Sequence, residues 1–319
     1  MIITVTLNPS LDRTIEVPDL VRGHVLRITG GHLHPGGKGV NVTRALLANR
    51  VPSRAVLPVG GQEGAQLVEM LGDDAVDAIT VSIAGHTRTN IAVAEPDGTV
   101  TKLNEPGPVV SPAELEAVVS AALDAARPGD WIVLCGSLPQ GADPDIYAQM
   151  VGRIRERGVR AAVDTSGPAL ARVVAAGPDL IKPNAEELAE AVGRPLPTRA
   201  AVVEAARELQ EAGALRVLVS LGGAGAILVD EDGVQVGTSV ALTPRSTVGA
   251  GDSFLAGYLS AESAGGASAL ATALSWGAAA VQLPGTQMPG PRDIDPAAAR
   301  VLTDDELVGL MDAPLVGTD

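Results

Sequence analysis

Aromatic side chains and cysteine are scarce in this sequence of 319 residues. Phe, Trp and Tyr make up 2% of the chain while hydrophobic residues reach 46%, so the core must be built from Ala, Val, Leu and Ile. The lone Cys135 excludes a disulfide framework and a cysteine-based zinc site, and it is compatible with a reducing compartment. The length suits one large α/β domain, with or without a small appendage.

Basic residues are also few, because 23 Lys and Arg face 38 Asp and Glu, for a net charge of −15. This balance argues against nucleic acid or an anionic membrane surface as a partner, so any phosphate site must be local. No apolar run reaches the roughly 18 residues of a membrane span. Residues 1–7 carry neither a basic region nor a cleavage site, and we expect a cytoplasmic protein.

The segment 246–253 reads STVGAGDS and leads into an apolar helical run. Its glycines allow a ligand to approach the backbone, and a helix that begins near Gly251 would direct unpaired N–H groups at an anion. A carboxylate at Asp252 would repel a phosphate but could act as a base toward an acceptor hydroxyl. An ordinary glycine-rich loop, with Asp252 as a first-turn partner of the helix dipole, remains the alternative.

A second glycine loop, GGKGVN at 36–41, opens onto a predicted helix. It is not a Walker A loop, because Lys38 is followed by Gly39 rather than by Ser or Thr. From the residues alone, Lys38 is either a phosphate ligand or a solvated surface lysine.

Residues 2–7 predict a buried strand, and we expect Asp12 in the loop just past it, at the sheet edge where α/β proteins bind ligands. Two β excursions, at about 13–33 and 86–105, interrupt the βα rhythm, and the second turns at Asp97-Gly98. They could pair into one small sheet that serves as a lid. Arg88 at its root could clamp a phosphate, or be a solvated charge.

From residue 111 strands and helices alternate regularly. Four successive strands deliver polar residues to one edge: Ser137, then Asp164, then Asn184 with Glu187, and finally Ser220 with Gly222. We find neither a fixed-period repeat nor a linker, so the β excursions are the only candidate for a second domain.

Over essentially its full length the chain resembles the ribokinase-like (PfkB) carbohydrate kinases. GGKGVN at 36–41 and TVGAGD at 247–252, about 210 residues apart, carry this resemblance, and KPNAEE at 182–187 supports it. It implies a Rossmann-type α/β/α sandwich with a small β-sheet lid, that is, one kinase domain over 1–319 with a discontinuous lid at about 13–33 and 86–105.

The resemblance also implies the site residues. Asp252 would be the base, with the backbone of Gly249, Ala250 and Gly251 as the anion hole. The expected sugar-phosphate ligands are Asp12, Gly36, Gly37, Lys38, Asn41, Arg88 and Ser137. The expected ATP-binding residues are Lys182, Asn184, Ser220, Gly222 and Gly225, with Glu187 organising Mg²⁺ through waters. A K⁺ requirement stays open, because Leu283 and Gln287 replace an asparagine and an arginine that are common in the family.

Ser246, with Thr87 and Arg88, is similar to the family branch that phosphorylates sugar phosphates. We therefore expect an ATP-dependent kinase of a ketohexose phosphate that forms a homodimer through its lid. Conversion of D-fructose 1-phosphate to fructose 1,6-bisphosphate ranks first, because Lys38 is similar to the 1-phosphofructokinase and tagatose-6-phosphate kinase loops; 6-phosphofructokinase and tagatose-6-phosphate kinase are the alternatives. A nicotinamide dehydrogenase is disfavoured, since no Gly-x-Gly-x-x-Gly follows the first strand, and a non-catalytic sugar-phosphate sensor is disfavoured by the intact base.

Overall fold

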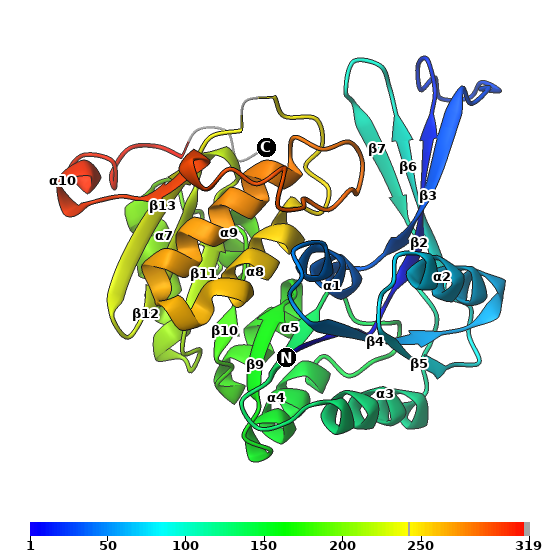
Figure 1. The fold of residues 1–319 in the computed structure, drawn as a ribbon, viewed down its shortest axis with the longest axis horizontal. Coiled ribbons are helices and arrows are strands. Elements are labelled where there is room, and N and C mark those ends of the chain that lie inside the picture. The colour runs from blue at the N-terminus through cyan, green and yellow to red at the C-terminus, as the bar shows by residue number, and fades with distance from the viewer. Residues whose placement is uncertain (242, 316–319) are drawn as a thin grey trace.

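The computed structural model describes residues 1–241 and 243–315. Within these residues a ten-stranded sheet carries helices on both faces, and a separate four-stranded sheet projects away from them (Figure 1). The order of the large sheet is β14-β13-β12-β11-β10-β9-β8-β1-β4-β5. The strands from β11 to β5 run parallel, whereas β12, β13 and β14 are antiparallel additions at one edge.

The central parallel strands are mostly apolar and buried because helices cover both of their faces. All five residues of β1 and of β8 are buried. The strands of this sheet are β1 Ile2–Thr6, β4 Ser53–Val59, β5 Ala78–Ser82, β8 Trp131–Cys135, β9 Arg160–Asp164, β10 Leu180–Ile181, β11 Val217–Ser220, β12 Ala226–Asp230, β13 Gly233–Ser239 and β14 Ala299–Val301.

Alternate residues of β1 enter two different cores. Ile3 and Val5 pack with helices α3 to α7, while Ile2 belongs to the core formed with α1, α8 and α9. On that second side α2 packs against β4 around Leu57 and Leu67. The helices are α1 Lys38–Ala48, α2 Gly61–Asp73, α3 Pro112–Ala125, α4 Ile146–Glu156, α5 Gly167–Val173, α6 Ala185–Val192, α7 Arg199–Glu211, α8 Ala250–Ala261, α9 Gly266–Ala280 and the short α10 Asp304–Leu307.

The small sheet joins the two β excursions in the order β3-β2-β6-β7. Its strands are β2 Ser10–Glu16, β3 Gly30–Gly36, β6 Arg88–Ala94 and β7 Val100–Asn104. The central pair β2 and β6 is parallel, with Asp12 opposite Asn90. The expectation that Asp12 lies in a loop is wrong: β2 begins already at Ser10, because residues 10–16 pair with β3 on one side and β6 on the other.

The order of the strands changes direction at β1, which creates a topological switch point beside this strand. From β1 the chain passes through the small sheet to β4 on one side and later to β8 on the other. In open α/β sheets ligands bind at such a point, outside the carboxyl ends of the strands. Only residues 7–9 separate β1 from β2, so the small sheet is rooted at this same edge.

Candidate active site

Asp252 lies in the first turn of α8, directly after the glycine-rich loop. Gly249 precedes the helix with a φ of 77°, a left-handed conformation that glycine adopts without steric cost. First-turn N–H groups have no acceptors within a helix, so the loop offers donors together with the positive end of the helix dipole. This geometry fits the expected anion hole.

Asp252 is 7% exposed, and its Oδ2 accepts a hydrogen bond of 2.9 Å from Nδ2 of Asn41 in α1. Burial raises the pKa of Asp252 to about 6, and the charge of Asp164 acts in the same direction. The hydrogen bond from Asn41 opposes this rise. A carboxyl group with this pKa is ionised at neutral pH and can still take up a proton, as a general base must.

Asp164, at the end of β9, lies fully buried between two lysines. Its Oδ1 is 2.7 Å from Nζ of Lys38, and its Oδ2 is 3.2 Å from Nζ of Lys182. Burial would raise the pKa of Asp164, but the Lys182 and Lys38 ammonium groups bring it below its usual value. Asp164 is therefore ionised at neutral pH.

Lys38 has a second acidic neighbour, because its Nζ lies 3.5 Å from Oε1 of Glu187. Burial tends to lower the pKa of Lys38, but Asp164 and Glu187 raise it above its usual value. Lys182 reaches the anion loop, since a Cβ built on Gly251 would lie 3.8 Å from its Nζ. A cation thus stands beside the N–H groups that precede Asp252.

On the side of the small sheet, Asp12 is held by neighbouring side chains. Its Oδ1 accepts hydrogen bonds from Ser10 Oγ at 2.6 Å and from Asn90 Nδ2 at 2.9 Å. A Cβ on Gly36 would overlap the Asp12 carboxyl group, so glycine is required there for this carboxylate to keep its position. Gly37, with φ of 117°, then precedes the first residue of α1.

Ser137 follows β8 and lies next to Asn8, which follows β1. Asn8 Nδ2 is 3.3 Å from Ser137 Oγ and donates to the carbonyl oxygens of Pro106 and Leu138. Asn8 therefore connects the carboxyl ends of two central strands to the segment that leaves the small sheet.

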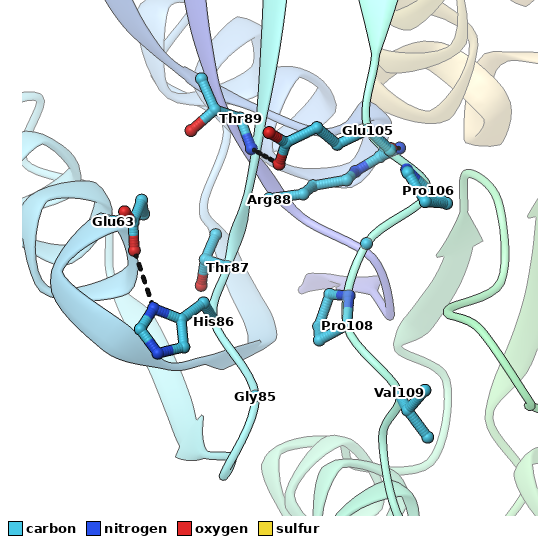
Figure 2. A pocket seen from close by; sticks show the side chains of 11 residues that line it. Glu63, Gly85, His86, Thr87, Arg88, Thr89, Glu105, Pro106, Pro108 and Val109 are labelled. Carbon is cyan, nitrogen blue, oxygen red and sulfur yellow. Dashed lines mark hydrogen bonds and ion pairs between the residues drawn. The ribbon is translucent and has the colours of Figure 1, made fainter.

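Arg88 stands at the root of β6. Its Nη1 donates to the carbonyl oxygen of Glu105 at 2.9 Å, and its Nη2 to that of Asn8 at 3.1 Å. Figure 2 shows Arg88 reaching across to the segment after β7 that carries Glu105 and Pro106, beside a cavity of about 550 Å³. Burial lowers the pKa of Arg88 although Asp12 and Glu105 oppose this shift.

The residues expected at the nucleotide gather around the start of α6. Asn184 and Glu187 form a capping box, in which Glu187 N donates to Asn184 Oδ1 at 2.7 Å and Asn184 N donates to Glu187 Oε2 at 2.9 Å. Ser220 pairs with Asn184 through an isolated β-bridge. Gly222 and Gly225 follow with φ of 56° and 98°, in the left-handed region that favours glycine.

Three side chains of the site have no role in the sequence-based assignment, Asn8, Asp164 and Asn90. Asp164 is one of the polar residues that follow the successive strands after residue 111. This pattern is the signal that could have identified it as a site residue. Asn90 lies inside an alternating strand, and its contact with Asp12 depends on the pairing of β2 with β6. The two β excursions were expected to pair, but nothing in the local sequence indicates the register that places Asn90 opposite Asp12.

Among the residues that the structure describes, no group of three or more His, Cys, Asp or Glu could by itself hold a metal ion. Within the same residues no helix combines the length and apolar character that crossing a membrane requires.

The chain is similar to known carbohydrate kinases over most of its length. Residues 5–293 match the model of the pfkB family carbohydrate kinases. The chain is 40% identical to the 1-phosphofructokinase of Rhodobacter capsulatus, covering 87% of this chain and 90% of the relative. It is 36% identical to the ATP-dependent 6-phosphofructokinase isozyme 2 of Escherichia coli K12, covering 80% of this chain and 83% of that protein.

The crystal structure of phosphofructokinase-2 from Escherichia coli in complex with substrates and products superimposes with a TM-score of 0.87 at 34% identity, covering 92% of this chain and 96% of that one. The expected fold and enzyme class, an α/β kinase that transfers phosphate to a hydroxyl group, are confirmed. The chain belongs to the pfkB family of carbohydrate kinases.

Proposed function

We propose that this kinase transfers the γ-phosphoryl group of ATP to D-fructose 1-phosphate, producing fructose 1,6-bisphosphate. One observation carries the chemical part of the proposal, namely the buried Asp252 carboxylate held by Asn41 at the start of an anion-binding helix. The 40% identity to a 1-phosphofructokinase over 90% of its length supports the choice of acceptor.

In the proposed reaction Asp252 accepts the proton of the acceptor hydroxyl as this oxygen attacks the phosphoryl group. The N–H groups of Gly249, Ala250 and Gly251, with the Lys182 ammonium nearby, stabilise the negative charge of the transferring group. Asn41 keeps the carboxylate in place through its amide N–H. Phosphoryl transfer depends mainly on such positioning and charge stabilisation.

The sugar side offers acceptors for hydroxyl groups. The side-chain carbonyl oxygens of Asn8, Asn41 and Asn90 are buried and have no hydrogen-bond partner, a costly arrangement unless a ligand supplies donors. Asp12, Gly36, Gly37 and Ser137 complete this side. A polyhydroxylated acceptor matches such a set of buried oxygens.

We assign Arg88 to the phosphate already present on the sugar. Two of its five N–H groups bind carbonyl oxygens, and its buried Nε has no partner, so donors remain for a phosphate. The family resemblance implies that Lys38 is also a sugar-phosphate ligand. In the structure Lys38 is paired with two carboxylates, and we place its charge on the nucleotide side of the site.

ATP would lie along Lys182, Asn184, Ser220, Gly222 and Gly225. The oxygen atoms of Glu187 and Asp164 are ligands of the kind that Mg²⁺ uses, and Mg²⁺ characteristically binds through one or two carboxylates together with substrate phosphates. When bound, Mg²⁺ would neutralise part of the charge on those phosphates. One solved relative, phosphofructokinase-2 from Escherichia coli, forms a complex with potassium, and a K⁺ requirement of this chain stays open.

We also propose a homodimer that forms through the small sheet. Val25, Ile28, Val100 and Leu103, from this sheet and its loop, are exposed, Val25 by 96%. Exposed apolar side chains gathered on one small sheet favour association. A cytoplasmic location stays a prediction.

Turnover of ATP coupled to sugar-phosphate acceptors tests the substrate. We expect the highest kcat/KM for fructose 1-phosphate, followed by fructose 6-phosphate and tagatose 6-phosphate, with little turnover of unphosphorylated fructose. A higher kcat/KM for fructose 6-phosphate would instead make the chain a 6-phosphofructokinase. If none of the sugar phosphates were phosphorylated, the result would indicate a non-catalytic sugar-phosphate sensor.

A further inference from the structure

The Lys38 ammonium lies in a position where two carboxylates could otherwise share a metal ion. Oxygen atoms of Asp164 and Glu187 are 2.7 and 3.5 Å from its Nζ. Both carboxylates are shielded from water, since the Asp164 side chain is 1% exposed and that of Glu187 15%. Buried carboxylates in such proximity need a cation, and Lys38 supplies it.

We propose that Lys38 is a resident cation that takes the place of a protein-bound divalent metal ion. With Lys38 present, the nucleotide-free enzyme holds no divalent ion between Asp164 and Glu187. The divalent ion that the reaction uses then enters together with the nucleotide. Lys38 is thus a positioning residue that acts through the two carboxylates.

Charge balance within the site supports this role. Three carboxylates, those of Asp164, Glu187 and Asp252, share the site with two ammonium groups, those of Lys38 and Lys182. Without Lys38 a single ammonium would face three carboxylates. This excess of negative charge in a shielded place would favour a divalent cation.

The surrounding backbone holds the two carboxylates and the ammonium group in their relative positions. Glu187 cannot turn away easily, because its Oε2 accepts the Asn184 N–H of the α6 capping box while Oε1 faces Lys38. Lys38 is the first residue of α1, so the helix holds its backbone in place. The two carboxylate oxygens would therefore remain near each other after replacement of the lysine.

Binding of Mn²⁺ to the full-length, nucleotide-free protein, followed by electron paramagnetic resonance, tests this proposal. We expect no stoichiometric binding by the wild type, and one Mn²⁺ bound at least about tenfold more tightly by Lys38→Met. Lys102→Met, in the exposed strand β7, is the matched control and should behave as the wild type. The double variant Lys38→Met/Glu187→Gln should lose the acquired binding.

Tight binding of one Mn²⁺ by the nucleotide-free wild type would overturn the proposal, and this arm requires no variant. Failure of folded Lys38→Met to gain binding would also overturn it, with thermal unfolding as the check on folding. Should Lys38→Met not fold, Lys38→Gln keeps a polar side chain of similar length and is judged by the same criterion. The measurement uses no sugar, so a result that contradicts this proposal would not bear on the proposed acceptor substrate.

Discussion

At the scale of single residues, Asp252 combines burial with a charge that the proposed reaction uses. Burial, and then the Asp164 carboxylate, raise its pKa to about 6. A base works only when ionised, so the protonated fraction below that pH is inactive. We expect kcat/KM to fall as the pH drops through about 6, approaching tenfold per pH unit. The measurement is kcat/KM between pH 5 and 8.

The phosphate of the substrate titrates in the same range, with a second pKa near 6. The Asn41→Ala variant distinguishes the titration of Asp252 from that of the substrate phosphate, because the hydrogen bond from Asn41 lowers the pKa of Asp252. Its removal should move the inflection to higher pH, whereas the substrate titrates as before. An inflection at the same pH in both proteins would assign the profile to the substrate.

At the scale of elements, the end of β3 determines the position of the Asp12 carboxylate, a proposed sugar ligand. Gly36→Ala would place a methyl group in the space of the Asp12 carboxyl group. We expect KM for the sugar phosphate to rise by about tenfold, the effect of roughly 1.4 kcal/mol of lost binding, with KM for ATP unchanged. Steady-state kinetics with each substrate varied in turn measures this.

The control for Gly36→Ala is Gly72→Ala in α2, where an added methyl group meets open space. This variant should retain the wild-type KM values. Equal KM values for the Gly36→Ala variant and the wild type would show that Asp12 does not contact the sugar.

The small sheet should respond to the acceptor as one unit, because β2 and β6 form its central pair. We expect the sugar phosphate to slow amide hydrogen exchange together in residues 10–36 and 88–104, as a closing lid would. Mass spectrometry of exchanged peptides resolves the two segments. Protection of only one of them would rule out closure of the sheet as a unit.

Local sequence signals predicted some elements better than others. The Asp97-Gly98 turn indicated the hairpin of β6 and β7, and STVGAGDS indicated the start of α8. The edge strand β5 has only a weak signal, since the alternation of its residues 78–82 extends over five residues and none of them is fully buried. The early start of β2 was missed because strand pairing, rather than local propensity, extends it to Ser10.

At the scale of the whole molecule, the fold brings together residues that are far apart in sequence. Asn41 and Asp252 are separated by 211 positions, and Lys38 and Asp164 by 126. The first pair was predictable to the extent that both residues lie in recognised family motifs. The second was not, because neither residue type nor spacing indicates which carboxylate a buried lysine will meet.

The positively charged residues of the site contrast with the acidic character of the whole chain. The chain carries a net charge of −15, so a phosphorylated acceptor and ATP meet positive charge only at local positions such as Arg88 and Lys182. The Lys182 ammonium and the α8 helix start supply that charge where the phosphoryl group would transfer.

Replacement of Asp252 by Asn tests most directly whether these distant segments form one catalytic centre. Asn preserves the shape of the side chain but cannot accept the proton, so kcat with fructose 1-phosphate should fall by about 10² to 10⁴ with nucleotide affinity little changed. The folded state disfavours the ionised carboxyl group, because its pKa is raised to about 6, and stability therefore decreases as the pH rises toward that value. The Asn variant should for this reason unfold at a higher temperature than the wild type at neutral pH, which verifies its fold. A folded variant that retains more than roughly a tenth of the wild-type kcat would contradict the assignment of Asp252 as the base.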